Sequence, residues 1–252
     1  MCCMNAIIHK LLLGSPVTCH SSCRADMGQF FVLVLNRGSP VTCHSSCRAD
    51  MGQFFRTWDV AFRILENINS VKNRAMLDVH DDNLLEETKI YICDINPNML
   101  NVGKKRAEER GFGDNKSLIW LEGDAEALKF EDDSMDGYTI AFGIRNVTHI
   151  EKALAEAYRV LKRGGRILCL ELSHVELPVF KELYDYYSFS VIPALGELVA
   201  GDRESYQYLV ESIRRFPSQE KFASMIAEAR FQKVEYENLV GGVVAIHSGV
   251  KF

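Results

Sequence analysis

The sequence has no run of eighteen apolar residues, so it predicts no helix that could span a membrane. It also has no excess of basic residues, because 29 Lys and Arg stand against 34 Asp and Glu and give a net charge of −5. Proteins that bind nucleic acid are usually basic, so we expect no nucleic-acid partner. A hydrophobic content of 47% excludes a chain that is disordered throughout.

Cysteine is scarce after residue 47, where the chain has only Cys93 and Cys169, both within apolar, strand-like runs. This usage is typical of a reducing compartment, in which cysteine serves as a small core residue. The other six cysteines all lie in the N-terminal segment, which needs a separate explanation.

That segment contains the same 18-residue sequence twice, at Gly14–Phe31 and again at Gly38–Phe55. Two repeats are too few for a solenoid, so a recent duplication or a fusion of unrelated coding sequence explains them best. The alternative is a zinc site, since Cys19, Cys23, Cys43 and Cys47 would supply four thiolates, although the C-x3-C spacing is unusual. We predict no resident metal. We expect residues 1–55 to be poorly ordered, with a composition that weakly indicates a mitochondrial presequence.

From residue 56 onward the pattern alternates between helix and strand. Apolar runs predict strands at residues 89–93, 118–121, 137–142, 166–172, 233–239 and 243–248. Helical spacing predicts helices at residues 60–68, 97–111 and 150–161, and Gly164-Gly165 should stop the last of them. The polar residues 71–88 predict a surface insert. This alternation predicts an α/β domain over residues 56–252, with a mostly parallel sheet and helices on both faces.

In such sheets, ligands bind at the carboxyl ends of the strands. Asp94 follows the first of these strands, Glu122–Glu126 follow the second, Gly143–Asn146 the third and Ser173-His174 the fourth. An acid in the position of Asp94 typically accepts hydrogen bonds from both hydroxyls of a ribose, and the alternative is that it only shapes the turn. Four polar strand ends together favour a nucleotide-like ligand.

Three of these segments, Asp94-Ile95-Asn96, Gly123–Glu126 and Phe142–Val147, resemble consecutive motifs of the class I S-adenosylmethionine methyltransferases. The stretch from Arg159 to Gly165, and Glu171-Leu172-Ser173, narrow the resemblance to the ubiquinone/menaquinone C-methyltransferase family, with arginine at 163 where proline is usual. Residues 206–209 and 212–217 extend it, so that it covers about residues 58–252 and is nearest to the eukaryotic mitochondrial branch.

The resemblance implies a Rossmann-like sheet with an antiparallel last strand, and S-adenosyl-L-methionine as cofactor. It implies C-methylation of a polyprenyl methoxy-benzoquinol ring in ubiquinone biosynthesis. The expected setting is a multi-subunit biosynthetic complex in contact with the matrix side of the mitochondrial inner membrane.

The resemblance also implies roles for individual residues. Asp94 would hold the ribose, and Asp124 with Ala125 the adenine. Arg145 would bind a substrate oxygen or orient a water that takes the proton, and its alternative role is a structural ion pair. Asn146 and Tyr206 would contact the substrate. Tyrosines at 184, 186, 187, 206 and 208 would line a channel for the polyprenyl tail or simply pack against the sheet.

The first family motif, a strand followed by a glycine-rich turn and a helix, is where the sequence departs from the pattern. Only Trp58–Arg63 resembles the tail of that motif, and its glycines are missing. Three hypotheses follow: a quinol C-methyltransferase, a non-catalytic structural member of the complex, or an incompletely assembled coding sequence. We expect methyl transfer to be severely impaired. We predict that the apolar run 30–35 fills the slot of the first strand beside residues 89–93, in the order of a β-α-β unit.

Overall fold

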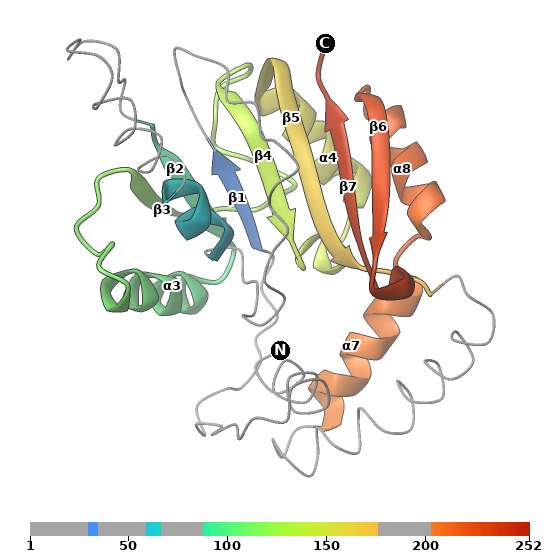
Figure 1. The fold of residues 1–252 in the computed structure, drawn as a ribbon, viewed down its shortest axis with the longest axis horizontal. Helices are drawn as coiled ribbons and strands as arrows, with labels where there is room; N and C mark the ends of the chain where they lie inside the picture. Colours follow the sequence, from blue (N-terminus) through green and yellow to red (C-terminus); the bar gives the residue numbers. More distant parts are fainter. Residues whose placement is uncertain (1–29, 35–58, 67–87, 176–202) are drawn as a thin grey trace.

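The computed structural model describes residues 30–34, 59–66, 88–175 and 203–252, with residues 30–34 and 203–206 described by their backbone alone. The described strands form one seven-stranded sheet in the order β3-β2-β1-β4-β5-β7-β6 (Figure 1). They are β1 (Phe30–Val34), β2 (Ile90–Asp94), β3 (Leu118–Glu122), β4 (Met135–Ala141), β5 (Leu161–Leu172), β6 (Gln232–Leu239) and β7 (Val244–Val250).

The predicted strand directions of the main sheet are confirmed. Strand β2 pairs with β3 in parallel, and β4 pairs with β5 in parallel. Because β2 and β4 are both antiparallel to the strand between them, these four strands run the same way. The last strand, β7, is antiparallel to β5, as predicted, and it is also antiparallel to β6.

The central strand β1 comes from the run that we predicted to fill this slot. Phe30 pairs with Asp94 and Val34 with Ile90, while on the other side Val32 pairs with Thr139. The prediction of a β-α-β order, which requires a parallel strand, is wrong: Figure 1 shows β1 pointing against β4. Apolar β-propensity carries no information on direction, and an antiparallel ladder satisfies the backbone groups at least as well as a parallel one.

The helices begin and end largely where the sequence predicts. Helix α3 (Pro97–Glu109) has proline in its first turn, and the Asn96 side chain caps it by accepting a hydrogen bond from the Asn98 amide at 2.9 Å. Residues 59–66 are helical, and α4 (Ile150–Val160), α7 (Arg203–Arg215) and α8 (Gln219–Glu228) follow. Short 3₁₀ turns are η1 (Ile144–Asn146) and η3 (Val240–Gly242).

The junction between α4 and β5 lies earlier than predicted. Helix α4 ends at Val160, and Gly164-Gly165 lie inside β5 rather than stopping the helix. Gly164 adopts a φ of +83°, and its amide donates to the Lys251 carbonyl at 2.7 Å, so this end of the strand is tied to the end of the chain. Glycine can adopt this left-handed conformation within a strand at no steric cost.

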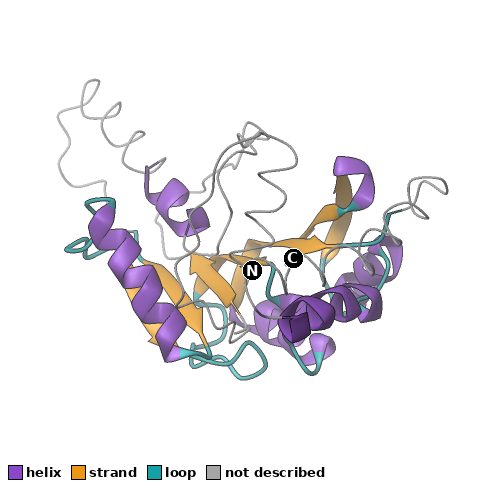
Figure 2. Cartoon of the chain, turned by 90° about the horizontal axis from the view of Figure 1, so that it is seen from below, coloured by secondary structure: helices purple, strands orange, loops and turns teal. Residues whose placement is uncertain are grey.

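Helices cover both faces of the sheet (Figure 2). The helical residues Ala61, Phe62 and Leu65 pack with Ile90 and Ile92 of β2 and with Ala107 of α3. Successive side chains of a strand point to opposite faces, so the cluster that contains Cys93 and Tyr91 lies on the other face, where α4 and α8 pack. Within the described ranges, every helix is too short or too polar to cross a membrane.

Candidate functional site

The predicted site residues that the structure describes gather at the carboxyl edge of the parallel strands. Asp94 ends β2 beside Glu122 at the end of β3, and the turn after β4 lies next to the end of β5. Since β1 runs against its neighbours, its first residue, Phe30, lies opposite Asp94 at this edge. The sheet therefore brings together residues that are about 50 positions apart in sequence, as Asp94 and Arg145 are.

Asp94 is a deeply buried acid at this edge, with 1% of its surface exposed. Its Oδ1 accepts a hydrogen bond from the Asn96 amide at 2.7 Å, whereas its Oδ2 is buried and has no partner among the described residues. Burial raises the pKa of this carboxyl to about 7, and the Asn96 hydrogen bond acts in the opposite direction. A hydroxyl donor placed at Oδ2 would relieve the cost of that unpaired oxygen, which is about 1–3 kcal/mol.

The loop after β3 approaches Asp94 through its backbone. The amide of Gly123 donates to the Asp94 carbonyl at 3.1 Å, which places Asp124 and Ala125 directly beyond the end of β2. The Asp124 carboxylate accepts from the Glu126 amide at 2.9 Å and so shapes the turn, and Ala125 is fully buried in the main core. Asp124 and Ala125 thus lie in the loop that follows β3, next to the end of β2.

Helix α4 holds this loop from outside. Glu156 accepts from the Leu128 amide at 2.8 Å, and Arg159 donates to the Leu128 and Phe130 carbonyls at 2.9 and 2.8 Å. The two side chains also pair with each other at 2.8 Å, and this contact with Arg159 lowers the pKa of Glu156. We did not predict these supporting contacts, because no sequence pattern indicates which loop a helical arginine will hold.

Arg145 lies in the η1 turn after β4, and its guanidinium is paired. Its Nη1 donates to Glu171 Oε1 at 2.8 Å and to the Phe142 carbonyl at 2.7 Å. The side chains of both partners are buried, at 0% and 1% exposure. The ion pair considered as an alternative role is therefore present, while Nε and Nη2 of Arg145 have no acceptor among the described residues.

The structure describes only some of the other residues that we predicted to contact the substrate. Asn146 closes the same 3₁₀ turn and is half-buried. Tyr206 belongs to α7, but its side chain lies outside the described residues, as do the tyrosines at 184, 186 and 187. Sequence reasoning missed Glu171 as a partner of Arg145, although it lies in the matched signature. Its position on a strand with almost no polar alternation was the available signal.

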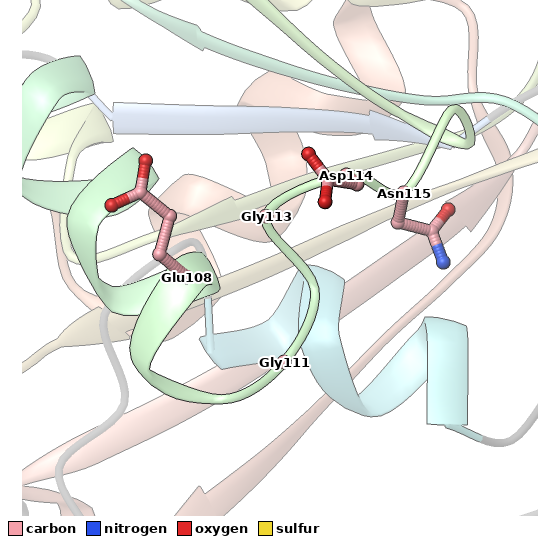
Figure 3. Close-up of a pocket in the computed structure, with 5 residues that line it drawn as sticks. All are labelled: Glu108, Gly111, Gly113, Asp114 and Asn115. Atoms are coloured by element: carbon pink, nitrogen blue, oxygen red, sulfur yellow. The ribbon is translucent and has the colours of Figure 1, made fainter.

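The described residues contain no cluster of three or more His, Cys, Asp or Glu side chains that could hold a metal. The cysteines of the duplicated sequence lie outside the described residues. A surface hollow lined by Glu108, Gly111, Gly113, Asp114 and Asn115 lies beyond the C-terminal end of α3 (Figure 3). Because α3 begins beside Asp94 and runs away from it, this hollow is at the opposite edge of the sheet and is not part of the site.

The residues at the carboxyl edge fit the ribose of a nucleoside-containing cofactor better than the end that a glycine-rich turn would hold. The open, buried oxygen of Asp94 fits a ribose hydroxyl. No glycine occurs between Gly52 and Gly103, so this stretch, which includes the helical residues 59–66, has no position where a ligand could approach the backbone as closely as a glycine turn allows.

A sheet of this order, with β7 antiparallel and an acid at the end of β2, defines the class I S-adenosylmethionine-dependent methyltransferase fold. The model of the ubiE/COQ5 methyltransferase family matches residues 53–251, and the chain belongs to this family. The resemblance inferred from the sequence motifs is thereby confirmed.

Curated relatives include proteins named mitochondrial 2-methoxy-6-polyprenyl-1,4-benzoquinol methylase. The Arabidopsis thaliana protein is 80% identical over 77% of this chain and 67% of its own length. The human protein is 53% identical over 77% of this chain and 64% of its own length. The chain thus spans about two thirds of the length of these relatives.

Solved structures overlap less extensively. An S-adenosylmethionine-dependent methyltransferase from Thermotoga maritima, described as a possible histamine N-methyltransferase, is 21% identical with a TM-score of 0.38, over 57% of this chain and 69% of its own. A putative methyltransferase from Bacillus halodurans is 17% identical with a TM-score of 0.43, over 62% of this chain and 80% of its own. The fold class therefore rests on the strand order and the family.

Proposed function

We propose that this protein transfers a methyl group from S-adenosyl-L-methionine to a ring carbon of a polyprenyl methoxy-benzoquinol in ubiquinone biosynthesis. Membership of the ubiE/COQ5 methyltransferase family and the names of the relatives support the reaction and the substrate class. The observation that carries the proposal is Asp94, a buried acid with one open oxygen at the carboxyl edge of the sheet.

Each residue at this edge has a proposed part. Asp94 would accept hydrogen bonds from the ribose, and Asp124 with Ala125 would border the adenine. Arg145, through Nε and Nη2, would hold an oxygen of the ring, with Asn146 and Tyr206 at the substrate. An arginine stays charged and is a poor base, so its role is to bind the oxygen or to orient a water that takes the proton.

The cofactor supplies the methyl group from a sulfonium. The substrate ring is nucleophilic because its hydroxyl and methoxy groups donate electrons to it. The protein then has to align the ring carbon with the methyl group and to exclude water, which are effects of orientation rather than of a strong acid or base. Hydrogen-bond donors to the ring oxygen stabilise the negative charge that is left there when the hydroxyl loses its proton, and this charge moves into the ring as the carbon attacks the methyl group.

A second candidate function is a non-catalytic member of the ubiquinone biosynthetic complex that retains only the adenosine end of the cofactor site. Two observations favour it. The glycine-rich turn of the family motif is missing between Gly52 and Gly103. In addition, β1 ends at Val34 opposite Ile90, so the chain leaves β1 at the edge away from Asp94, where a turn could not serve the cofactor.

The proposed setting is the matrix side of the mitochondrial inner membrane, with peripheral membrane contact and no nucleic-acid partner. The relatives are named mitochondrial, and the negative net charge agrees with the absence of nucleic acid. The proposed division of the chain is a duplicated segment over residues 1–55, which contributes the strand β1 to the sheet, and a methyltransferase domain over residues 56–252. The family match, which begins at residue 53, supports this division.

One experiment separates the two functions. Adenosine and S-adenosylmethionine are titrated into the full chain by calorimetry, and methyl transfer to a demethyl benzoquinol is assayed on the same preparation. Tighter binding of S-adenosylmethionine than of adenosine, together with turnover, supports the methyltransferase. Equal affinity for the two ligands without turnover supports the non-catalytic member, and no binding of either contradicts both.

A further inference from the structure

One carboxylate holds two parts of the same arginine at the carboxyl edge. Oε1 of Glu171 accepts from Nη1 of Arg145 at 2.8 Å and from the Leu172 amide at 2.9 Å. Oε2 of Glu171 accepts from the backbone amide of Arg145 at 3.3 Å. Because Glu171 is on β5 and Arg145 is in η1, this carboxylate fixes the turn after β4 to the end of the next strand.

The same guanidinium supports a backbone conformation that is unfavourable by itself. Phe142, the first residue after β4, has a φ of +56°, in the left-handed region that bulky residues rarely adopt. Its amide donates to the Leu170 carbonyl at 2.8 Å, and its carbonyl accepts from Nη1 of Arg145 at 2.7 Å. Such a conformation persists where the surrounding contacts hold it, and positions of this kind cluster at functional sites.

These contacts use only one side of the guanidinium. Nε and Nη2 form its other edge, and both are buried without an acceptor among the described residues. Two parallel N–H groups make a fork that suits oxygen acceptors. Glu171 balances the charge of Arg145 at 2.8 Å, so the pair as a whole is neutral. The Nε and Nη2 edge of the guanidinium therefore offers two donors without a net charge.

We propose that Glu171 is a positioning residue that holds Arg145 so that Nε and Nη2 meet a phenolic oxygen of the ring substrate, and that its charge lets this edge take the neutral phenol as readily as the phenolate. This inference rests on the proposed function, because the ring oxygen is that of the quinol. Donors already in place then hold the oxygen in both protonation states, so the phenolate that forms when the hydroxyl loses its proton meets them without reorganisation.

The test measures binding rather than methyl transfer, so its outcome is independent of turnover. The probe is 4-nitrophenol, whose neutral and anionic forms differ in absorbance, titrated to equilibrium at pH values below and above its own pKa. We expect wild type to bind the two forms with dissociation constants within about threefold of each other, because the Arg145–Glu171 pair carries no net charge. Asp94 titrates in the same pH range but is unchanged in every variant, so its effect cancels when the ratios of the variants are compared with that of wild type. Wild type that binds neither form would overturn the proposal, whether or not the chain methylates a quinol.

Glu171→Gln keeps the shape of the side chain and removes its charge. The guanidinium is then uncompensated, so the phenolate should bind about tenfold or more tightly than the phenol. Glu171→Asp keeps the charge and should restore the wild-type ratio of the two affinities. An unchanged ratio in folded Glu171→Gln would show that Glu171 only supports the structure.

The matched control is Glu156→Gln, which removes the charge of a carboxylate that pairs with Arg159 on α4. Its ratio of affinities should equal that of wild type, and a change as large as that of Glu171→Gln would contradict the proposal. If circular dichroism shows that Glu171→Gln does not fold, the double variant Arg145→Gln/Glu171→Gln leaves no buried charge. Loss of both forms of the probe from this variant supports the proposal, and retained affinity overturns it.

Discussion

Asp94 combines two properties that rarely occur together in an acid, deep burial and an oxygen left without a donor among the described residues. Burial raises its pKa to about 7, so near neutral pH a substantial fraction of the carboxyl groups is protonated. Two ribose hydroxyls need acceptors, and the ionised form offers more of them. Ligand binding at this residue is therefore coupled to the loss of a proton.

This coupling predicts that the affinity for adenosine rises with pH. Between about pH 6 and about pH 8, adenosine should bind progressively more tightly and should release a proton into the buffer. Calorimetry in buffers of different ionisation enthalpy measures that proton directly. Affinity that does not change with pH, without proton release, would mean that Asp94 does not face the ribose.

His247 predicts a loss of stability in acid. It is 1% exposed, its Nε2 lies 3.0 Å from the Gln219 carbonyl, and its ring packs against Phe222 and Tyr236. Burial lowers its pKa below the ordinary value of 6.5, so the unfolded chain binds more protons than the folded chain below that pH. The stability contributed by neutral His247 is thus complete above pH 6.5 and is lost as the pH falls.

Urea unfolding of wild type and His247→Gln at several pH values checks this prediction. Wild type should lose more free energy of unfolding between neutral and mildly acidic pH than the variant does. The comparison with the variant is needed because Asp94, with a raised pKa, contributes stability that changes in the opposite direction with pH. Equal slopes for the two proteins would contradict the account of His247.

Among the secondary-structure elements, β1 is the one whose direction in the sheet the sequence patterns determine least. It lies outside the residues matched by the family model and is antiparallel to both neighbours, yet it pairs along its length with β2. A central strand with partners on both sides should exchange its amide hydrogens slowly. We expect the amides of residues 30–34 to be protected about as well as those of β2.

Hydrogen exchange of the full chain, read by mass spectrometry, tests this element. Val32→Pro removes one amide from the strand, and the free energy of unfolding should fall by at least about 1 kcal/mol. If residues 30–34 of wild type exchange at the rate of an unstructured peptide, β1 is not part of the sheet in solution.

Helix α4 supports the site through Arg159, which donates to two carbonyls of the loop after β3 and pairs with Glu156 and Asp132. Arg159→Ala should lower the free energy of unfolding by about 2 kcal/mol, since several charge-assisted hydrogen bonds are lost together. Lys162→Ala is the control, because its ion pair with Asp136 is partly exposed and is expected to contribute less than about 1 kcal/mol. Equal effects in thermal or urea unfolding would show that Arg159 does not hold the loop.

For the whole molecule, the sequence predicts the parallel strands and the antiparallel β7, because apolar runs and helix punctuation are local signals. It also predicts that Asp94, Asp124 and Arg145 share one edge, since that follows from the carboxyl ends of parallel strands. The direction of β1 could not be predicted, because backbone pairing is possible in both directions. The Arg145–Glu171 pair could not be predicted either, since 26 residues separate its members and only the packed sheet brings them together.

The account depends most on whether the carboxyl edge binds the cofactor through Asp94. The direct measurement is a calorimetric titration of S-adenosylmethionine into wild type, Asp94→Ala and Asp114→Ala, the last a change of an exposed acid at the opposite edge. We predict saturable binding by wild type and Asp114→Ala, and a dissociation constant about tenfold or more weaker for Asp94→Ala, because the ribose hydroxyls lose their acceptor. The same dissociation constant for wild type and Asp94→Ala would contradict the account.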